Sequence, residues 1–297
     1  MSIISPSSAA PPLRHAWVFG GTGQIGERVL ARLHARGVAA TAWSRQPRAG
    51  RPGVAWREGG LDDAGAVPDD VDAVFSCGPL DHFARWFAAQ PAAPARVVAF
   101  GSTSVEVKAD SADPGERDVA RRLAQAEATL FAAAAARGTA ATVLRPTLVY
   151  GAGRDATLTV IAAMARQRGF FVLPRSASGL RQPVHVDDLA DAALAAWAAP
   201  ATHQRAYAVG GGEVLAYDEM VARVLRALAP PARLHRVPTP LFAGALRMAH
   251  AAGRLRGLNA QALRRMRADL VFDLAPARRD FGYAPRGFAP VAADIGG

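Results

Sequence analysis

The chain is poor in cysteine, and it has no long apolar run. Its 297 residues contain a single cysteine, Cys77, which excludes an intramolecular disulfide and a cysteine-based zinc cluster. No apolar run approaches the roughly 20 residues that a membrane-spanning helix needs. Residues 1–14 are rich in Ser, Ala and Pro and lack the basic and apolar regions of a secretory signal. We therefore expect a protein of the reducing cytoplasm that begins with a disordered tail over residues 1–14.

Lysine is almost absent, although the chain is basic. Lys108 is the only lysine among 35 basic residues, which outnumber the 25 acidic ones and give a formal net charge of +10. The arginines are spread along the chain and are not interleaved with aromatic residues, so we expect no nucleic-acid partner. With 51% hydrophobic residues, the chain has enough apolar side chains for a packed core, which excludes a disordered protein.

Short apolar runs alternate with helical segments through the first half of the chain. The runs that we expect to form strands cover residues 16–19, 38–43, 54–56, 71–75, 96–100 and 142–144. Such alternation is typical of a parallel sheet with helices on both faces. A long Ala-rich helix over about 118–137 ends before Gly138. The predicted fold class is α/β, with a Rossmann-type doubly wound parallel sheet over residues 15–150.

The pattern becomes irregular beyond Gly151. Shorter strands are expected over residues 170–173, 183–186 and 206–209. Asp187 and Asp218 are placed to cap the helices that follow them. We predict that residues 151–297 form mainly a smaller mixed substrate lobe, with about 180–210 returning to the Rossmann sheet.

Glycines at positions 20, 23 and 26 follow the first predicted strand and open the next helix. In this context the backbone N–H groups and the helix N-terminus can receive a pyrophosphate, although glycines also serve close packing of helix and sheet. The turn therefore predicts a dinucleotide site. The residues that we expect to bind the cofactor here are Gly20, Thr22, Gly23, Gln24, Ile25 and Gly26.

The end of the second strand indicates which dinucleotide is bound. An NAD enzyme places Asp or Glu there, on the ribose 2′-hydroxyl, whereas this chain has Ser44 and Arg45. Arginine suits the 2′-phosphate of NADP by charge and by bidentate geometry. We predict NADP(H) in preference to NAD(H), the alternative being a solvated arginine. Asp62, after the third strand, is a candidate for the adenine edge or an ordinary surface carboxylate.

Several motifs in this order resemble the extended short-chain dehydrogenase/reductase family, of the NAD(P)-dependent epimerase/dehydratase type. They cover residues 20–26, 101–104, 145–151, 181–188 and 270–285. The resemblance implies an oxidoreductase or epimerase/dehydratase acting on a small polar substrate or a nucleotide sugar. It also implies a homodimer that pairs through two long helices of the nucleotide domain.

The resemblance assigns roles to matching residues. Ser104, or its neighbour Thr103, stands where the family places the hydroxyl that bonds the substrate oxygen. Pro146 stands where the backbone lines the nicotinamide, and Arg181 where sugar-nucleotide members hold a substrate phosphate. Tyr150 lies at the sheet edge where ligands bind, so it is a candidate substrate contact, with a packing role as the alternative.

The family's catalytic Tyr-x-x-x-Lys pair is missing. Aligning Glu127 with the glutamate that usually trails this pair puts Val119 and Leu123 at the two functional positions, and the helix has no tyrosine or lysine. Because that tyrosine is a general acid/base, the protein either uses another acid or performs no hydride chemistry. The alternative function is therefore a non-catalytic NADP(H)-binding sensor or structural subunit.

Two further segments have a structural and a functional interpretation. His185 and the pair Asp187–Asp188 resemble a structural segment of the family, so we expect a hydrogen-bond network there and predict no metal site. A basic amphipathic helix over residues 240–256 could lie on an anionic membrane or dock a partner. We favour packing of its apolar stripe on the substrate lobe. That stripe comprises Leu241, Ala245, Met248, Ala252 and Leu255, opposite Arg247, His250 and Arg254.

Overall fold

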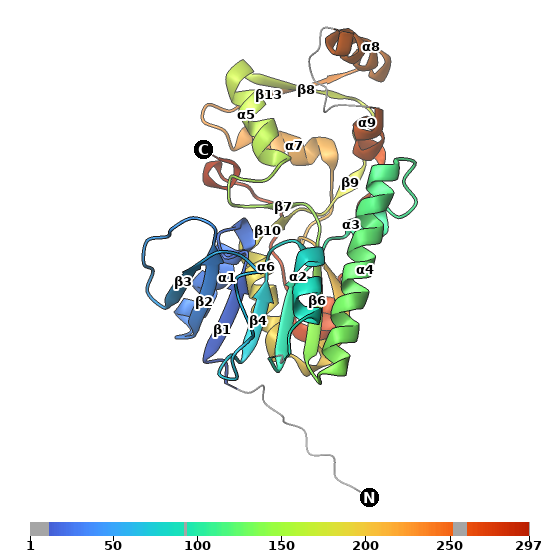
Figure 1. The fold of residues 1–297 in the computed structure, drawn as a ribbon. Coiled ribbons are helices and arrows are strands. Elements are labelled where there is room, and N and C mark those ends of the chain that lie inside the picture. Colours follow the sequence, from blue (N-terminus) through green and yellow to red (C-terminus); the bar gives the residue numbers. More distant parts are fainter. Residues whose placement is uncertain (1–11, 92–93, 252–259, 297) are drawn as a thin grey trace, which may run out of the picture. The chain divides into compact units, whose positions relative to one another are not determined.

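The computed structural model describes residues 12–91, 94–251 and 260–296, which divide into two compact units (Figure 1). Unit 1 consists of Met1–Pro146, Asp187–Val209 and Leu274–Tyr283, and unit 2 of Thr147–Val186, Gly210–Asp273 and Ala284–Gly297. The sequence predicted a return to the sheet over about 180–210 but not the second return, Leu274–Tyr283. Among the described residues, no helix combines the length and the apolarity of a membrane span.

The described part of unit 1 is built on a seven-stranded parallel sheet with the order β11-β6-β5-β4-β1-β2-β3. Its strands are β1 (His15–Phe19), β2 (Ala39–Ser44), β3 (Val54–Glu58), β4 (Ala73–Ser76), β5 (Arg96–Phe100), β6 (Ala140–Pro146) and β11 (Arg205–Val209). This is the doubly wound order, in which the chain reverses direction across the sheet between β1 and β4. The predicted fold class is confirmed.

Helices cover both faces of this sheet (Figure 1). They are α1 (Gln24–Ala35), α2 (Leu80–Ala88), α3 (Ser104–Val107), α4 (Pro114–Ala136), α6 (Val186–Ala198) and α10 (Ala275–Phe281), with a 3-10 turn η1 (Pro200–Thr202). On one face Arg32 of α1 is paired with Asp191 of α6 at 2.7 Å, and on the other α2 packs against α4. Helix α4 starts earlier than predicted because Asp113 caps it by accepting a hydrogen bond from the Gly115 amide at 2.7 Å.

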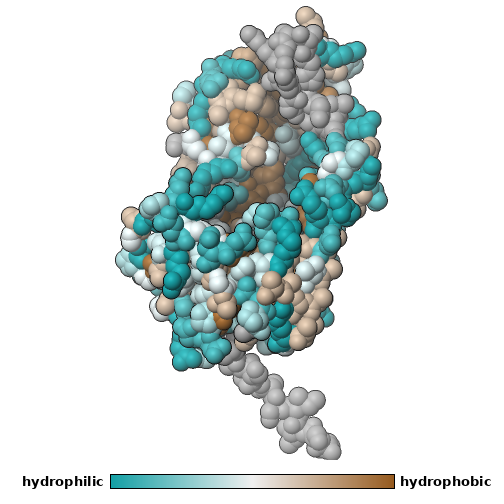
Figure 2. All heavy atoms as spheres, viewed as in Figure 1, coloured by the Kyte–Doolittle hydropathy of each residue, from teal (hydrophilic) through white to brown (hydrophobic). Residues whose placement is uncertain are grey.

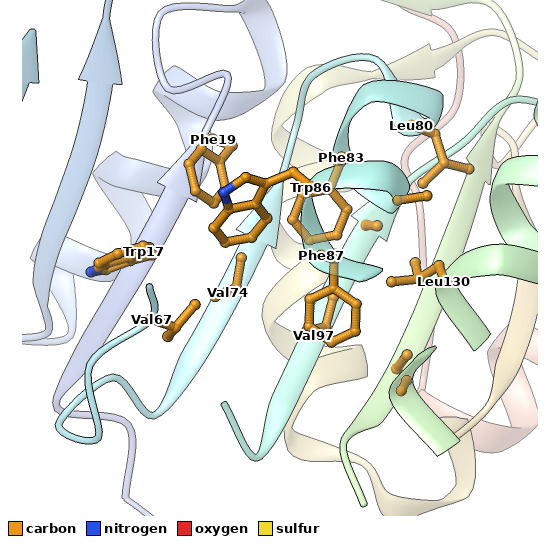
Figure 3. Packing of buried hydrophobic residues seen from close by; sticks show 14 of the residues in the cluster. Trp17, Phe19, Val67, Val74, Leu80, Phe83, Trp86, Phe87, Val97 and Leu130 are labelled. Carbon is orange, nitrogen blue, oxygen red and sulfur yellow. The ribbon is translucent and has the colours of Figure 1, made fainter. Parts of the chain in front are cut away.

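An aromatic core between the sheet and α2 fixes the position of β1 (Figure 3). The ring centroids of Trp17 and Trp43 are 4.5 Å apart, and those of Phe19 and Trp86 are 4.7 Å apart. Each such buried side chain stabilises the fold by roughly 1.5–3 kcal/mol. The visible surface of unit 1 mixes hydrophilic side chains with others of intermediate hydropathy, and few strongly hydrophobic ones are seen there (Figure 2). The core thus holds the end of β1, where the glycine turn begins, in a defined place.

Unit 2 is mixed and contains several short pairs of strands. Its helices are α5 (Leu158–Arg168), α7 (Tyr217–Arg226), α8 (Thr239–Ala251) and α9 (Ala260–Arg267), with a 3-10 turn η2 (Ala292–Ile295). Its strands are β7 (Val149–Tyr150), β8 (Phe170–Pro174), β9 (Leu180–Arg181), β10 (Val184–His185), β12 (Leu215–Ala216) and β13 (Arg233–Val237). They pair as β10-β7 and β13-β8 in parallel and as β12-β9 antiparallel.

Two expectations about helix starts are wrong. Asp187 and Asp218 lie in the first turns of α6 and α7, not at their caps, because Ala216 is the extended residue that precedes α7 and α6 begins at Val186. The carboxylate of Asp218 instead pairs with Arg236 at 2.7 Å.

The amphipathic helix also differs from its prediction. The side chains of Leu241 and Met248 are 64% and 76% exposed and Ala245 is exposed, so the predicted stripe does not pack on unit 2. Leu246 is buried in their place, because α8 turns a different side toward the unit. The predicted stripe residues Ala252 and Leu255, Arg254 opposite them, and residues 1–11 of the predicted tail lie outside the described residues.

Candidate functional site

The glycine turn of unit 1 is closed so tightly that two of its positions exclude any side chain. Gly20 has a φ of +72°, and a Cβ there would lie 2.7 Å from the backbone carbon of Cys77. A Cβ on Gly26 would lie 2.1 Å from the carbonyl oxygen of Gly20. That oxygen accepts a hydrogen bond from the Gly23 amide at 2.9 Å, which closes the turn. The close approach brings the start of α1 directly behind the end of β1.

The start of α1 is suited to an anion. Gly23 is the N-cap and supplies no side-chain acceptor for the first amides of the helix. The amides of such a first turn have no partner within the helix, and together with the helix dipole they favour a negative group. Thr22 lies in the turn and Ile25 in the first helical turn, both half-buried. The structure therefore brings the predicted residues 20–26 together in one cradle.

Two buried polar atoms beside this cradle have no hydrogen-bond partner in the described protein. They are Oε1 of Gln24, the first residue of α1, and Oγ of Ser76, the last residue of β4. Ser76 is paired in register with Phe19, the last residue of β1. A buried polar group without a partner costs about 1–3 kcal/mol, and a bound polar molecule can supply that partner. Ser76 was not predicted, since a lone serine at a strand end carries no motif.

The end of β2 carries cations on an ordered loop. The hydroxyl of Ser44 donates to the carbonyl of Gln46 at 2.7 Å and accepts from its amide at 3.2 Å. Arg48 donates to the same hydroxyl at 3.4 Å, and both Arg45 and Arg48 are exposed. Ser44 therefore orders the loop, while the two arginines are available at its surface.

Asp62 lies on the surface of unit 1. It is exposed and borders a surface depression with Arg85, Trp86 and Gln90, near the end of α2. Trp86 in turn contacts the ring of Phe19, the residue before the glycine turn, with the ring centroids 4.7 Å apart. The role of Asp62 at the adenine edge stays a prediction.

The ends of β5 and β6 are tied together by Thr103. Its hydroxyl and its amide both donate to the carbonyl of Pro146, at 3.1 and 3.2 Å. Ser104 is half-buried and begins α3, and its amide donates to the hydroxyl of Ser102 at 3.1 Å. The Ser104 hydroxyl makes no hydrogen bond within the described residues. Of the two predicted hydroxyls, that of Ser104 is therefore the one available to a substrate.

An ion network around the buried Glu127 lies next to this segment, and the sequence reasoning missed it. Arg145 of β6 donates to both carboxylate oxygens of Glu127 on α4 and, at 2.7 Å, to Glu106 on α3. Hydrogen bonding to Glu127 raises the pKa of Arg145. A Cβ on Gly101 would lie 3.3 Å from Glu127, so the network borders the 101–104 segment. The signal was a lone glutamate on the apolar face of an Ala-rich helix, because buried charges are paired.

The two positions of α4 at which we expect the family's acid/base pair carry aliphatic side chains. Val119 and Leu123 are half-buried, and Leu123 packs against the aromatic core. Neither can move a proton. Burial raises the pKa of Cys77 to about 12, which keeps this neighbour of the glycine turn a thiol at neutral pH.

Unit 2 buries the predicted phosphate-binding arginine. Arg181 is 4% exposed and donates to the carbonyls of Leu180 and Ala268, each at 2.7 Å, and to that of Arg265. Its guanidinium also lies 5.1 Å from the ring centre of Tyr217. Burial lowers the pKa of Arg181. In this structure the arginine holds the end of α9 to β9 and does not present an open anion site.

Tyr150 is a core residue of unit 2. It is 1% exposed, and its ring meets those of His185 and Phe288 edge-on at 5.1 and 4.9 Å. His185 lies 3.3 Å from the carboxylate of Asp294, a contact of the structural kind that we expected. Within the described ranges no group of three His, Cys, Asp or Glu side chains is arranged for a metal ion.

The comparison with protein families agrees with the resemblance seen in the sequence. Residues 88–210 match the model of the NAD dependent epimerase/dehydratase family. No curated protein matches the chain. The resemblance to the epimerase/dehydratase type is therefore confirmed.

Solved structures of similar fold include a dehydratase, an epimerase and an enzyme solved with NADH. A NAD dependent NDP-hexosamine 5,6-dehydratase, TunA, is 18% identical, with 93% of each chain covered and a TM-score of 0.65. The Bordetella bronchiseptica enzyme WbmF, solved with NADH, is 16% identical over 96% of this chain and 89% of that one, with a TM-score of 0.66. UDP-glucose 4-epimerase from Thermotoga maritima, solved with UDP-glucose, is 15% identical over 92% and 94%, with a TM-score of 0.63.

Proposed function

We propose that the protein binds NADP(H) in unit 1 and acts as an NAD(P)-dependent oxidoreductase or epimerase/dehydratase on a nucleotide sugar or another small polar substrate. The observation that carries this proposal is the glycine cradle, in which Gly20 and Gly26 exclude side chains while Gln24 and Ser76 keep unpartnered buried polar atoms. The similar folds solved with NADH and with UDP-glucose support the same ligand classes.

The cradle residues fit the dinucleotide. The amides at the start of α1 would receive the pyrophosphate, with Gln24 and Ser76 as polar partners. Pro146, at the end of β6, would lie along the nicotinamide. When bound, the nicotinamide supplies hydride transfer. Every residue named here lies at the carboxyl edge of the sheet, where ligands bind in doubly wound folds.

The preference for NADP(H) rests on the loop after β2. That strand ends in Ser44, whose hydroxyl is engaged within the loop, and no carboxylate stands there for a ribose 2′-hydroxyl. Arg45 and Arg48 offer two guanidinium groups to a 2′-phosphate. WbmF was solved with NADH, so this preference would separate the present chain from that neighbour.

Ser104 is the residue that we assign to the reacting oxygen of the substrate. Its hydroxyl would orient that oxygen, and the ion network of Arg145 and Glu127 would hold the surrounding segment in place. Arg181 then acts as a positioning residue for α9, and Tyr150 as a packing residue. The proton must come from a group other than Val119 or Leu123. Those two aliphatic residues favour a second candidate function, a non-catalytic NADP(H)-binding sensor or structural subunit.

Calorimetric titration tests the proposal. The cofactor-free protein is titrated with NADPH, NADP⁺ and NADH, beside an Arg45→Asp variant. We expect NADPH to bind more tightly than NADH, and the variant to lose at least tenfold in NADPH affinity, since it replaces a charge-assisted hydrogen bond by repulsion. Absence of binding by any of the three nucleotides would overturn both candidate functions.

Turnover separates the two candidates. The holoprotein is assayed with a panel of sugar nucleotides and small carbonyl compounds, following the nicotinamide absorbance and the epimerised or dehydrated products. Turnover that falls in Ser104→Ala while NADPH affinity stays constant supports the enzyme. Tight binding without turnover of any panel member favours the sensor. A cytoplasmic location and a homodimer are part of this proposal and would be tested by fractionation and by sedimentation.

A further inference from the structure

The net positive charge of the chain comes from one stretch of sequence. Residues 220–268 contain ten of the 35 basic residues and none of the 25 acidic ones. The rest of the chain has 25 residues of each sign and is neutral. The described part of this stretch forms the end of α7 and the elements β13, α8 and α9 of unit 2. Three of its arginines, Arg223, Arg226 and Arg236, are paired with carboxylates that lie just before the stretch.

Helix α8 adds protruding apolar side chains to this charge. Leu241 and Met248 are 64% and 76% exposed, the largest values among the large hydrophobic residues that reach the described surface. They lie seven positions apart and therefore on one side of the helix, with Ala245 between them. Arg247 is exposed beside Met248. Since Leu246 is buried, α8 is apolar both toward unit 2 and toward solvent.

An apolar groove runs beside this stripe. It encloses about 330 Å³ between α5, β8, β13 and α8, and the side chains of Leu241 and Ala245 form one of its walls. The exposed ring of Phe170 lies on the β8 side, and Arg168 is the one charged residue among its lining. Its volume is at the lower end of the range of small-molecule sites, and its lining is almost wholly apolar.

We propose that α8 and this groove dock unit 2 on the surface of an anionic lipid bilayer. Leu241 and Met248 would enter the boundary between headgroups and acyl chains, and Arg247 would lie among the phosphates. Each arginine near such a surface strengthens binding about fivefold at physiological salt. An anionic bilayer matches both the exposed apolar side chains and the positive charge, because acyl chains and negative headgroups lie at one surface. A second copy of this face would match the apolar side chains only, since its positive charge would repel that of the first copy.

Flotation with lipid vesicles tests the proposal on the full chain. Vesicles of phosphatidylcholine alone are compared with vesicles that also contain phosphatidylglycerol. We expect binding to the anionic vesicles, little binding to the neutral ones, and weaker binding as salt is raised. The double variant Leu241→Ser/Met248→Ser should lose about tenfold in affinity. Val291→Ser, which alters a 57% exposed residue of unit 2 outside the basic stretch, is the matched control and should bind like the parent.

A second pair of variants isolates the charge. Arg247→Gln should lower affinity for anionic vesicles about fivefold, whereas Arg57→Gln, an exposed arginine on β3 of unit 1, should leave it unchanged. NADPH titration of the same variants should match the parent, which shows that each is folded and keeps the test separate from the proposed function. The five altered side chains, three on α8 and two in the controls, are all exposed, so loss of folding is not expected.

Several outcomes would overturn the proposal. Equal binding to neutral and anionic vesicles would show that the basic stretch does not contribute to binding. Unchanged binding by Leu241→Ser/Met248→Ser would show the same for α8. Retention on heparin without vesicle binding would indicate that the basic stretch binds a soluble polyanion. A concentration-dependent dimer that the double variant abolishes would indicate that Leu241 and Met248 contact a second copy of the chain.

Discussion

Replacing Gly26 by alanine should damage the dinucleotide cradle, although alanine is the better helix former. Gly26 lies within α1, where the exchange would ordinarily favour the helix by about 0.5–1 kcal/mol. The added Cβ, however, would stand 2.1 Å from the carbonyl oxygen of Gly20 and 2.8 Å from its carbonyl carbon and from the Cα of Gly21. Helix and turn must therefore separate by roughly 1 Å, since contacts below 3.0 Å are essentially never seen. Overpacking of this kind costs about 1–3 kcal/mol.

The same displacement affects ligand binding. The Gly20 carbonyl also accepts the Gly23 amide at 2.9 Å, so moving it disturbs the turn that aims the first amides of α1. Loss of one hydrogen bond to a charged group costs about 1.5–3 kcal/mol, which is roughly 10- to 100-fold in affinity. We expect Gly26→Ala to bind NADPH at least tenfold more weakly, by calorimetry, and to have a lower free energy of unfolding in urea.

Gly244 provides the matched control. It lies within α8, and a Cβ there would have no atom within 4 Å. Gly244→Ala should therefore raise the free energy of unfolding by up to about 1 kcal/mol and leave NADPH affinity unchanged. The reasoning is refuted if Gly26→Ala binds NADPH within twofold of the parent and is as stable as Gly244→Ala.

Three further predictions concern other parts of the molecule. Glu127→Gln should lower the free energy of unfolding by about 1–3 kcal/mol, because it removes the buried carboxylate that accepts two hydrogen bonds from the half-buried guanidinium of Arg145; a loss below 0.5 kcal/mol in urea would contradict this. Hydrogen bonds from Arg223 hold the pKa of Glu213 below its usual 4.5, so the stability that this carboxylate contributes is present above pH 4.5 and is lost as pH falls through the lowered pKa. The melting temperature of the parent should consequently fall more steeply from pH 5 to pH 3 than that of Glu213→Gln, and parallel curves would count against the pairing. Cys77 is half-buried, and desolvation raises its pKa to about 12, so iodoacetamide should react far more slowly at pH 8 with the native protein than in urea; equal rates would show that the thiol is not desolvated.

The features that the sequence could predict are those set by local spacing. The glycine turn and the alternation of strands and helices are patterns of neighbouring residues. The fold class and the cradle around Gly20 and Gly26 could therefore be predicted from the sequence. Asp113 was overlooked as the cap of α4, yet the Pro at the next position was a usable signal. Helix starts near Asp187 and Asp218 were misjudged because a capping residue and an acidic residue of the first turn look alike in sequence.

The features that could not be predicted depend on distant partners. Arg181 donates hydrogen bonds to the carbonyls of Arg265 and Ala268, more than 80 positions away. Every residue has a backbone carbonyl, so the sequence does not indicate which carbonyls will accept these bonds. The outward face of α8 was missed for a related reason. Both sides of that helix are apolar, so its periodicity alone could not decide whether Leu241 or Leu246 would be buried.

The state of the cradle bears on how the missing catalytic pair should be interpreted. A chain that no longer bound a dinucleotide would gain stability by replacing the unpartnered polar atoms of Gln24 and Ser76 with apolar groups. This chain keeps both of these destabilising features, and its helix α4 contains no tyrosine or lysine. These features favour the proposed dinucleotide site even though α4 lacks the residues of the expected acid/base pair. NADPH affinity and turnover must therefore be measured separately, because tight binding of NADPH would not establish that the protein turns over a substrate.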